Sequence, residues 1–190
     1  LLFLFYKVFG IYPRLAVLLN CLLHSVAVLS SYSVFKWFSE HSKLKTISSH
    51  AAKIALLSSL ALLFHPLINY YCMMIIHPFS LDVCLLILTL YFMVRYFKES
   101  SVSNLIIMGC VTGIAVLNRT SFIVLLFPFF LQMAFQYSIM SAIKKTLVLS
   151  VMCLLLLTPW LYRNYSIYGR ISLNSSIGQN LWIGIQKTTD

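Results

Sequence analysis

Charged residues are scarce in this chain, and acidic residues are the scarcest. Of its 190 residues, 9% are charged and 61% are apolar, whereas a globular domain has about 25% charged residues. The four acidic residues are Glu40, Asp82, Glu99 and Asp190. This composition excludes a soluble domain, and it offers no pair of carboxylates for acid–base catalysis.

The chain also lacks the short motifs of several enzyme classes. It has no His-Glu-x-x-His zinc motif, no P-loop and no serine-triad pattern. No Cys-x-x-Cys pair occurs, so metal and redox roles are not indicated, and we expect the cysteines to be small buried apolar residues. They are Cys21, Cys72, Cys84, Cys110 and Cys153. Residues 1–5 carry no basic region and position 1 is not Met, so we expect an internal part of a longer protein and not a signal peptide.

Apolar residues fall in six blocks, most of them near the length of about 20 residues that crosses a bilayer. They predict an all-α, polytopic bundle of about six membrane helices, at residues 15–35, 54–76, 79–97, 102–117, 122–139 and 146–161. We expect Pro66 and Pro128 to kink the second and fifth helices. Gly109 and Gly113 in the fourth are spaced for close helix packing, and packing within this chain is favoured over a specific dimer motif.

Basic residues lie at the ends of the apolar blocks, so the net charge of +10 indicates membrane topology and not nucleic-acid binding. The loops after the first, third and fifth segments contain Lys36, Lys43, Lys45, Lys53, Arg95, Lys98, Lys144 and Lys145. The loops after the second and fourth contain only Arg119. Because lysine and arginine concentrate in cytoplasmic loops, we expect His77, Arg119 and Arg163 to share the outer side of the membrane.

The most unusual stretch runs from residue 158 to 184, where the last apolar block gives way to Pro159-Trp160. Aromatic and amide side chains are dense here: Trp160, Tyr162, Asn164, Asn180 and Trp182. Tryptophan and tyrosine are typical of the membrane–water interface. Rings and amides also suit contacts with a sugar or a lipid headgroup, so the stretch predicts a recognition surface.

Two arginines are candidates for binding an anion. Arg119 ends the short fourth segment, and Arg163 follows the sixth. Each either extends to the headgroups of surrounding lipid or uses its guanidinium fork to bind a lipid phosphate. The neighbours Trp160, Tyr162 and Asn164 favour the functional hypothesis for Arg163.

Two further ionisable residues lie near the same side. Asp82 stands one turn into the third segment, where an ionisable group is costly and often functional. A structural pairing with His77 or Arg119 is the alternative. His77 precedes Pro78 at an outer turn, and it is either a hydrogen-bonded structural residue or part of the site.

The tail resembles that of bacterial polyprenyl-phosphate-sugar glycosyltransferases of the protein mannosyltransferase-like class (family 39, GT-C type). The residues that carry the resemblance are Pro159, Trp160, Arg163, Asn164, Tyr168, Gly169, Arg170, Gly178, Asn180, Leu181 and Gly184. Looser similarity covers Lys7 to Gly10 with Arg14, and the glycine-rich fourth segment ending at Arg119. The chain departs from the family at His77, where an acidic residue is common.

The resemblance implies an integral-membrane enzyme that transfers a sugar from a polyprenyl-phosphate donor to a glycan, lipid or protein acceptor on the non-cytoplasmic face. It implies a multi-pass protein of the bacterial plasma membrane, with a membrane core at residues 1–162 and an outer-facing loop region, periplasmic or lumenal, at 163–190. The implied donor-phosphate residues are Arg119, Arg163 and Lys7, and the implied substrate surface is His77, Trp160, Tyr162, Asn164, Asn180 and Trp182. The catalytic carboxylate is expected upstream of Leu1. No metal or further cofactor is assigned, and no nucleic acid is expected.

Two other functions remain open. A transporter or lipid flippase core is compatible with six helices, the prolines and the glycine-rich half-helix. Such proteins usually place ionisable groups near the bilayer midplane, whereas here these groups lie mostly at the ends of the apolar segments. A noncatalytic or degenerate membrane protein is compatible with the missing carboxylates. An acidic residue in an outer loop after one more membrane helix would favour the transferase.

Overall fold

The computed structural model describes residues 7, 12–74 and 78–173, and within these ranges it contains helices and no strand. The helices are α2 (Pro13–Glu40), α3 (Lys45–Ser49), α4 (Ala51–Leu63), α5 (Pro66–Met73), α6 (Phe79–Glu99), α7 (Val102–Asn118), the 3₁₀-helix η1 (Thr120–Leu125), α8 (Leu126–Gln136) and α9 (Ile139–Tyr168). The prediction of an all-α membrane bundle is confirmed.

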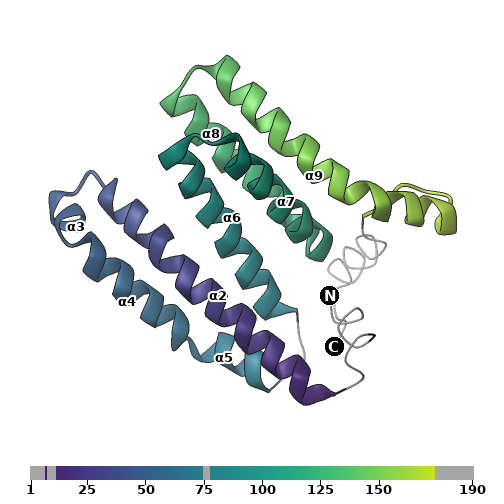
Figure 1. Ribbon diagram of the computed structural model, residues 1–190, viewed down its shortest axis with the longest axis horizontal. Coiled ribbons are helices and arrows are strands. Elements are labelled where there is room, and N and C mark those ends of the chain that lie inside the picture. The colour runs from purple at the N-terminus through teal and green to yellow at the C-terminus, as the bar shows by residue number, and fades with distance from the viewer. Residues whose placement is uncertain (1–6, 8–11, 75–77, 174–190) are drawn as a thin grey trace, which may run out of the picture.

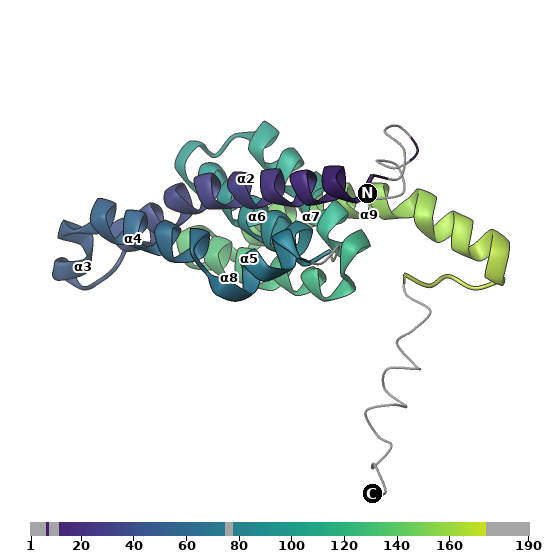
Figure 2. The ribbon, with the colours of Figure 1, turned by 90° about the horizontal axis from the view of Figure 1, so that it is seen from below.

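The helices lie side by side, with α6 in the middle of the bundle (Figure 1). On one side of α6 lie α2 and the α4–α5 pair, and on the other lie α7, α8 and α9. Viewed from below, these helices form a slab, and the end of α9 projects beyond it (Figure 2). The Trp37 ring of α2 stacks on the Phe97 ring of α6 at 5.7 Å, so these two helices run parallel and share their C-terminal end.

Three helices of the described part are long and apolar enough to cross a membrane, namely α2, α6 and α9. A fourth span is possible if α4 and α5, bent by 45° at their junction, count as one. The described residues of the six predicted segments are largely helical, but α7 and the η1–α8 pair are shorter apolar helices, so the count of about six membrane helices is not confirmed. At 17 residues α7 rises about 25 Å, less than the roughly 30 Å of a hydrocarbon core.

The two prolines act differently. Pro66 is the first residue of α5, and His65 caps this helix by accepting a hydrogen bond from the Ile68 amide through Nδ1 at 3.4 Å. Here the predicted kink is confirmed as a break between two helices. Pro128 lies in the first turn of α8, where a helix tolerates proline best, and the change from η1 to α8 occurs just before it.

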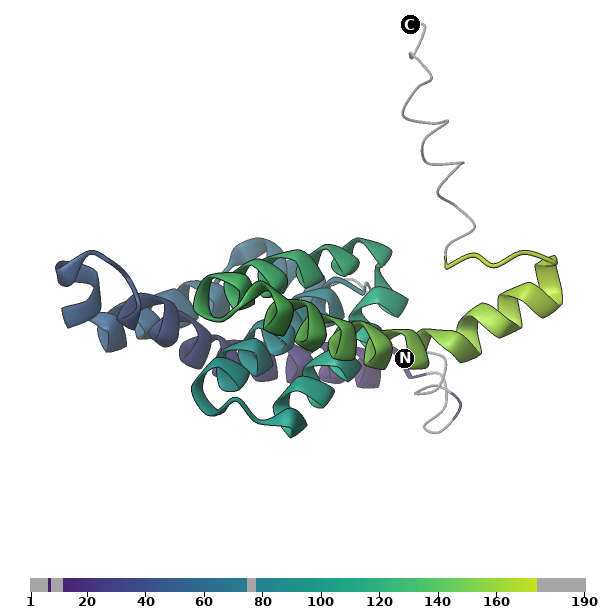
Figure 3. The same ribbon diagram turned by 90° about the horizontal axis from the view of Figure 1, so that it is seen from above.

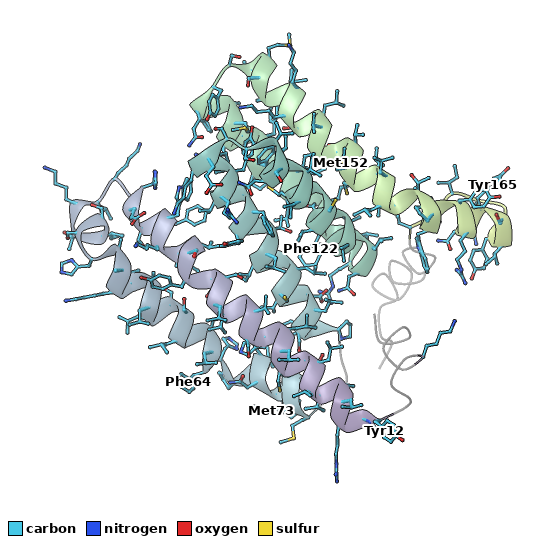
Figure 4. All side chains as sticks on the ribbon, in the orientation of Figure 1. Tyr12, Phe64, Met73, Phe122, Met152 and Tyr165 are labelled. Atoms are coloured by element: carbon cyan, nitrogen blue, oxygen red, sulfur yellow. The ribbon has the colours of Figure 1, made fainter. Side chains whose placement is uncertain are left out.

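Close contact between α7 and α9 depends on Gly109. A Cβ on Gly109 would lie 2.7 Å from the Cβ of Met152, and one on Gly113 would lie 3.2 Å from the Cβ of Leu156. Figure 4 labels Met152 on α9. The two glycines therefore serve packing within the chain, as predicted, and a large cluster of buried side chains from α6 to α9 surrounds Phe129.

The cysteines are free, as expected for small apolar residues in membrane helices. Cys72, Cys84 and Cys153 are buried, and Cys21 and Cys110 are partly buried. Within the described ranges, no group of three or more histidine, cysteine or acidic side chains is placed to hold a metal ion.

Candidate functional site

Helix α9 is longer than the sequence predicts. The expected sixth segment ends at Leu161, but α9 continues through Pro159 to Tyr168. Proline removes one backbone donor from a helix interior, but α9 is continuous through Pro159. The Thr158 hydroxyl just before it donates to the Leu154 carbonyl at 2.8 Å. The helix therefore ends at Tyr168 and not at about Leu161, where the predicted segment ends. The last turns of α9 extend beyond the neighbouring helices (Figure 1, Figure 3).

Gly169 turns the chain back along the end of α9. It has φ of +65°, the left-handed conformation that favours glycine, and its amide bonds to the Tyr165 carbonyl at 2.8 Å. Asn164 Nδ2 then donates to the Ser172 carbonyl at 2.7 Å, and Trp160 Nε1 donates to the Leu173 carbonyl at 3.3 Å. Two side chains of the helix thereby hold the returning segment against it.

A pocket of about 190 Å³ lies between the end of α9 and this returning segment. Its lining residues are Trp160, Arg163, Asn164, Tyr168, Arg170, Ser172 and Leu173. The guanidinium of Arg163 lies 5.1 Å from the centre of the Trp160 ring, and its Nη1 donates to Asn164 Oδ1 at 3.4 Å. Among the described residues, no carboxylate lines this arginine pocket. Its chemistry therefore suits an anion.

An apolar groove of about 290 Å³ lies beside the arginine pocket, on the same end of α9. It is lined by Thr158, Leu161, Tyr162, Tyr165 and Ile171. Tyr162 is 72% exposed and lines this groove, whereas Trp160 and Asn164 line the arginine pocket. The predicted aromatic surface thus has two faces, and Figure 4 labels Tyr165 on the extended part of α9.

Arg119 forms a separate ionic cluster where α6 begins and α7 ends. Its Nη2 lies 3.3 Å from Asp82 Oδ2, an ion-pair contact without hydrogen-bond geometry. Asn118 Nδ2 donates to Asp82 Oδ1 at 2.5 Å. The Asp82 side chain is buried (8% exposed), whereas that of Arg119 is 55% exposed. The structural pairing of Asp82 with Arg119 is confirmed, and it leaves part of the guanidinium facing outward.

Arg119 and the arginine pocket belong to the same end of the bundle. Gly109 packs against Met152, and Gly113, four residues later, packs against Leu156, also four residues later. Helices α7 and α9 therefore run parallel in a constant register. Extending that register places Arg119 near the level of Tyr162 on α9. Leu173 of the returning segment also packs against the buried cluster that joins α7 and α9.

Other predicted site residues are not brought together with the pocket. Lys7 is exposed and is not among the pocket's lining residues. His77, Asn180 and Trp182 lie outside the described residues. Sequence reasoning missed Tyr168, Arg170 and Ser172 as lining residues, although the Tyr-Gly-Arg sequence carries the signal: a glycine directly after a helix turns the chain back.

The comparisons place the chain in a family. Residues 1–162 match the profile of the family described as dolichyl-phosphate-mannose-protein mannosyltransferase. The chain belongs to this mannosyltransferase family. Family membership and the apolar helices make it part of an integral-membrane glycosyltransferase of the GT-C type. No curated protein and no solved structure matches the chain significantly.

The family match includes some site residues and leaves out others. Arg119 and Trp160 fall inside the matched range, whereas Arg163 and Arg170 follow it. The arginine pocket is therefore supported by its own geometry and by the residues of the tail, and the mannosyltransferase match supports the helices on which it is built.

Proposed function

We propose that the chain forms the donor-binding half of a mannosyltransferase-like enzyme that transfers a sugar from a polyprenyl-phosphate donor to a protein or glycan acceptor. The observation that carries the proposal is the arginine pocket, where two guanidinium-bearing side chains line one small cavity without a carboxylate among the described residues. The family name, dolichyl-phosphate-mannose-protein mannosyltransferase, describes a donor in which mannose is linked to a lipid phosphate. A phosphate is the anion that such a pocket suits.

The chemistry gives the arginines a definite task. When the sugar leaves the lipid phosphate, negative charge develops on the phosphate oxygens, and preorganised donors that face this charge lower the barrier. Arg163 is preorganised because the Trp160 ring and Asn164 Oδ1 hold its guanidinium. Arg170 lines the same pocket from the returning segment. We assign the phosphate to these two side chains.

Arg119 has a secondary role in this proposal. Asp82 neutralises part of its charge, so an anion gains less from Arg119 than from Arg163. Its exposed side still offers donors at the same end of the bundle. We place it at the rim of the donor site, where it would contact the sugar or the phosphate approach.

None of the described carboxylates suits the base that activates the acceptor hydroxyl. Asp82 is buried and engaged by Asn118 and Arg119. Glu40 and Glu99 lie at the opposite end of the bundle, 3.9 Å from Lys36 Nζ and 3.4 Å from Arg95 Nη2 respectively. We therefore assign the base to none of the three. The lysine-rich loops at that opposite end support an outer, non-cytoplasmic location for the arginine pocket in a bacterial plasma membrane.

The test is sugar transfer from a polyprenyl-phosphate donor by the full-length protein in lipid vesicles. Arg163→Gln should lower kcat/KM roughly 10- to 100-fold, the effect of one charged hydrogen bond. The kcat/KM of Arg163→Lys should lie between those of the wild type and Arg163→Gln. The lysine ammonium keeps the positive charge but lacks the forked pair of donors of a guanidinium. Arg95→Gln, at the opposite end, is the matched control. Unimpaired turnover by Arg163→Gln would refute the assignment.

A further inference from the structure

A second polar pocket lies at the opposite end of the bundle, where α6 ends and α7 and α9 begin. Its volume is about 280 Å³, at the lower end of ligand pockets, which run from about 300 Å³. Its polar lining comes from Tyr96, Ser100, Lys144 and Lys145. We call it the lysine pocket; it lies far along the helices from the arginine pocket and takes no part in the proposed transfer.

Lys145 is held in place by two aromatic rings. Its Nζ lies 3.9 Å from the centre of the Tyr137 ring and 5.5 Å from that of Tyr96. The Tyr137 hydroxyl is in turn 3.3 Å from Ser100 Oγ, which joins the end of α8 to the loop between α6 and α7. Cation–π contacts of this kind fix an ammonium without neutralising its charge. The pocket therefore presents an oriented positive charge, with Lys144 exposed beside it.

The nearest carboxylate does not cancel this charge. Glu99 Oε2 forms an ion pair with Arg95 Nη2 at 3.4 Å and accepts a hydrogen bond from Asn104 Nδ2 at 3.0 Å. It is thus engaged on its own helix and at the start of α7, and it is not a lining residue of the lysine pocket. Lys98 adds a further positive charge in the last turn of α6. An anion entering the lysine pocket meets an excess of cations.

The rest of the pocket lining is apolar and partly exposed. Val102, Leu105 and Val148 complete its lining, and Val102 and Val148 are 67% and 38% exposed. Leu147 and Val151 of α9 continue this exposed apolar surface along the helix. Cations next to an apolar strip match an amphiphile with an anionic head and hydrocarbon chains, whereas a free anion would use only the cations.

We propose that the lysine pocket binds the phosphate of an anionic phospholipid, with an acyl chain lying along α9 past Val148. Lys144 and Lys145 contact the phosphate, and Ser100 supplies a hydroxyl donor. The loop charges expected to face the cytoplasm gather at this end, and basic pockets between membrane helices on that side are suited to anionic headgroups.

The test is native mass spectrometry of the purified protein, titrated with phosphatidylglycerol or with phosphatidylcholine of the same acyl chains. The wild type should retain phosphatidylglycerol preferentially, and Lys144→Gln with Lys145→Gln should weaken that retention about 30-fold, from the loss of two cations near a lipid surface. The matched control is Lys43→Gln with Lys45→Gln, two exposed lysines just before and at the start of α3, at the same end of the bundle. It should bind as the wild type does.

Two further experiments distinguish a lipid phosphate from free inorganic phosphate and control for misfolding of the double variant. Inorganic phosphate at millimolar concentration should not displace the lipid; full displacement would show a phosphate site and overturn the proposal. The exposed Lys144→Gln alone should fold normally and weaken retention severalfold, with folding checked by thermal unfolding. Equal retention of both lipids by the wild type, or equal loss in the Lys43→Gln and Lys45→Gln control, would also overturn it.

Discussion

The contact between α7 and α9 gives the sharpest prediction about stability. In Gly109→Ala the new Cβ would lie 2.7 Å from the Cβ of Met152 and 3.1 Å from the Leu149 carbonyl oxygen. Both atoms are fixed to the α9 backbone, so the helices must move apart. Overpacking of this kind costs about 1–3 kcal/mol, and the gain in helix propensity from glycine to alanine returns about 1 kcal/mol.

We expect Gly109→Ala to lower the free energy of unfolding by about 2 kcal/mol, because the clash lies at the rigid end of the overpacking range. Gly113→Ala should lower the free energy of unfolding by less, because no atom fixed to the α9 backbone lies closer than 3.2 Å to the new Cβ. The Cys153 carbonyl oxygen and Leu156 Cβ lie at 3.2 Å, and the closest atom, Leu156 Cδ1 at 3.1 Å, is the far end of a flexible side chain. The measurement is unfolding of the purified protein in mixed micelles by titration with a denaturing detergent.

A double-mutant cycle separates the clash from general damage. Met152→Gly removes the opposing Cβ and should restore part of the stability lost in Gly109→Ala, whereas Met152→Ala keeps that Cβ and should restore none. Equal stability of Gly109→Ala and the wild type would refute the close approach of α7 and α9. So would rescue by Met152→Ala, because the clash would then involve the end of the side chain.

Substitutions at three positions, Asp82, Gly169 and Trp160, test the candidate site. Asp82→Asn should keep an acceptor for Asn118 but remove the carboxylate that neutralises Arg119, so KM for the lipid donor should fall severalfold; an unchanged KM would separate Arg119 from the donor site. Gly169→Ala should destabilise the turn by about 1–2 kcal/mol because its φ is positive, which lowers donor affinity, and Gly169→Asn should do so less; equal affinity in the wild type and the alanine variant would contradict a built pocket. Trp160→Leu should lower kcat more than it raises KM, since the ring preorganises the Arg163 guanidinium for the charge that develops in the transition state; an effect on KM alone would argue against this role.

The sequence predicted the helices well because each apolar block carries its own signal. It predicted the outcome at Gly109 because the spacing of small residues reports close packing in a membrane. It failed at the end of α9, where Pro159 and the loss of apolar residues both signal a stop. The projecting turns are held to the returning segment by hydrogen bonds from Trp160 and Asn164, and these contacts are not visible along the chain.

Only part of the site was predicted, because the remaining contacts depend on how the chain folds back in space. Arg163 stood out through its aromatic neighbours. The place of Arg170 depends on the left-handed Gly169, whose effect is a reversal in space. The pairing of Asp82 with Arg119 depends on the antiparallel contact of α6 with α7, which brings together residues far apart in sequence.

The central claim is that the arginine pocket binds the phosphate of the lipid-linked donor. It is tested most directly by a cryo-electron microscopy structure of the full-length protein with a polyprenyl-phosphate sugar bound. We predict phosphate density within hydrogen-bond distance, about 2.7–3.2 Å, of the guanidinium groups of Arg163 and Arg170. Phosphate density held by other residues, with the arginine pocket empty, would contradict the account.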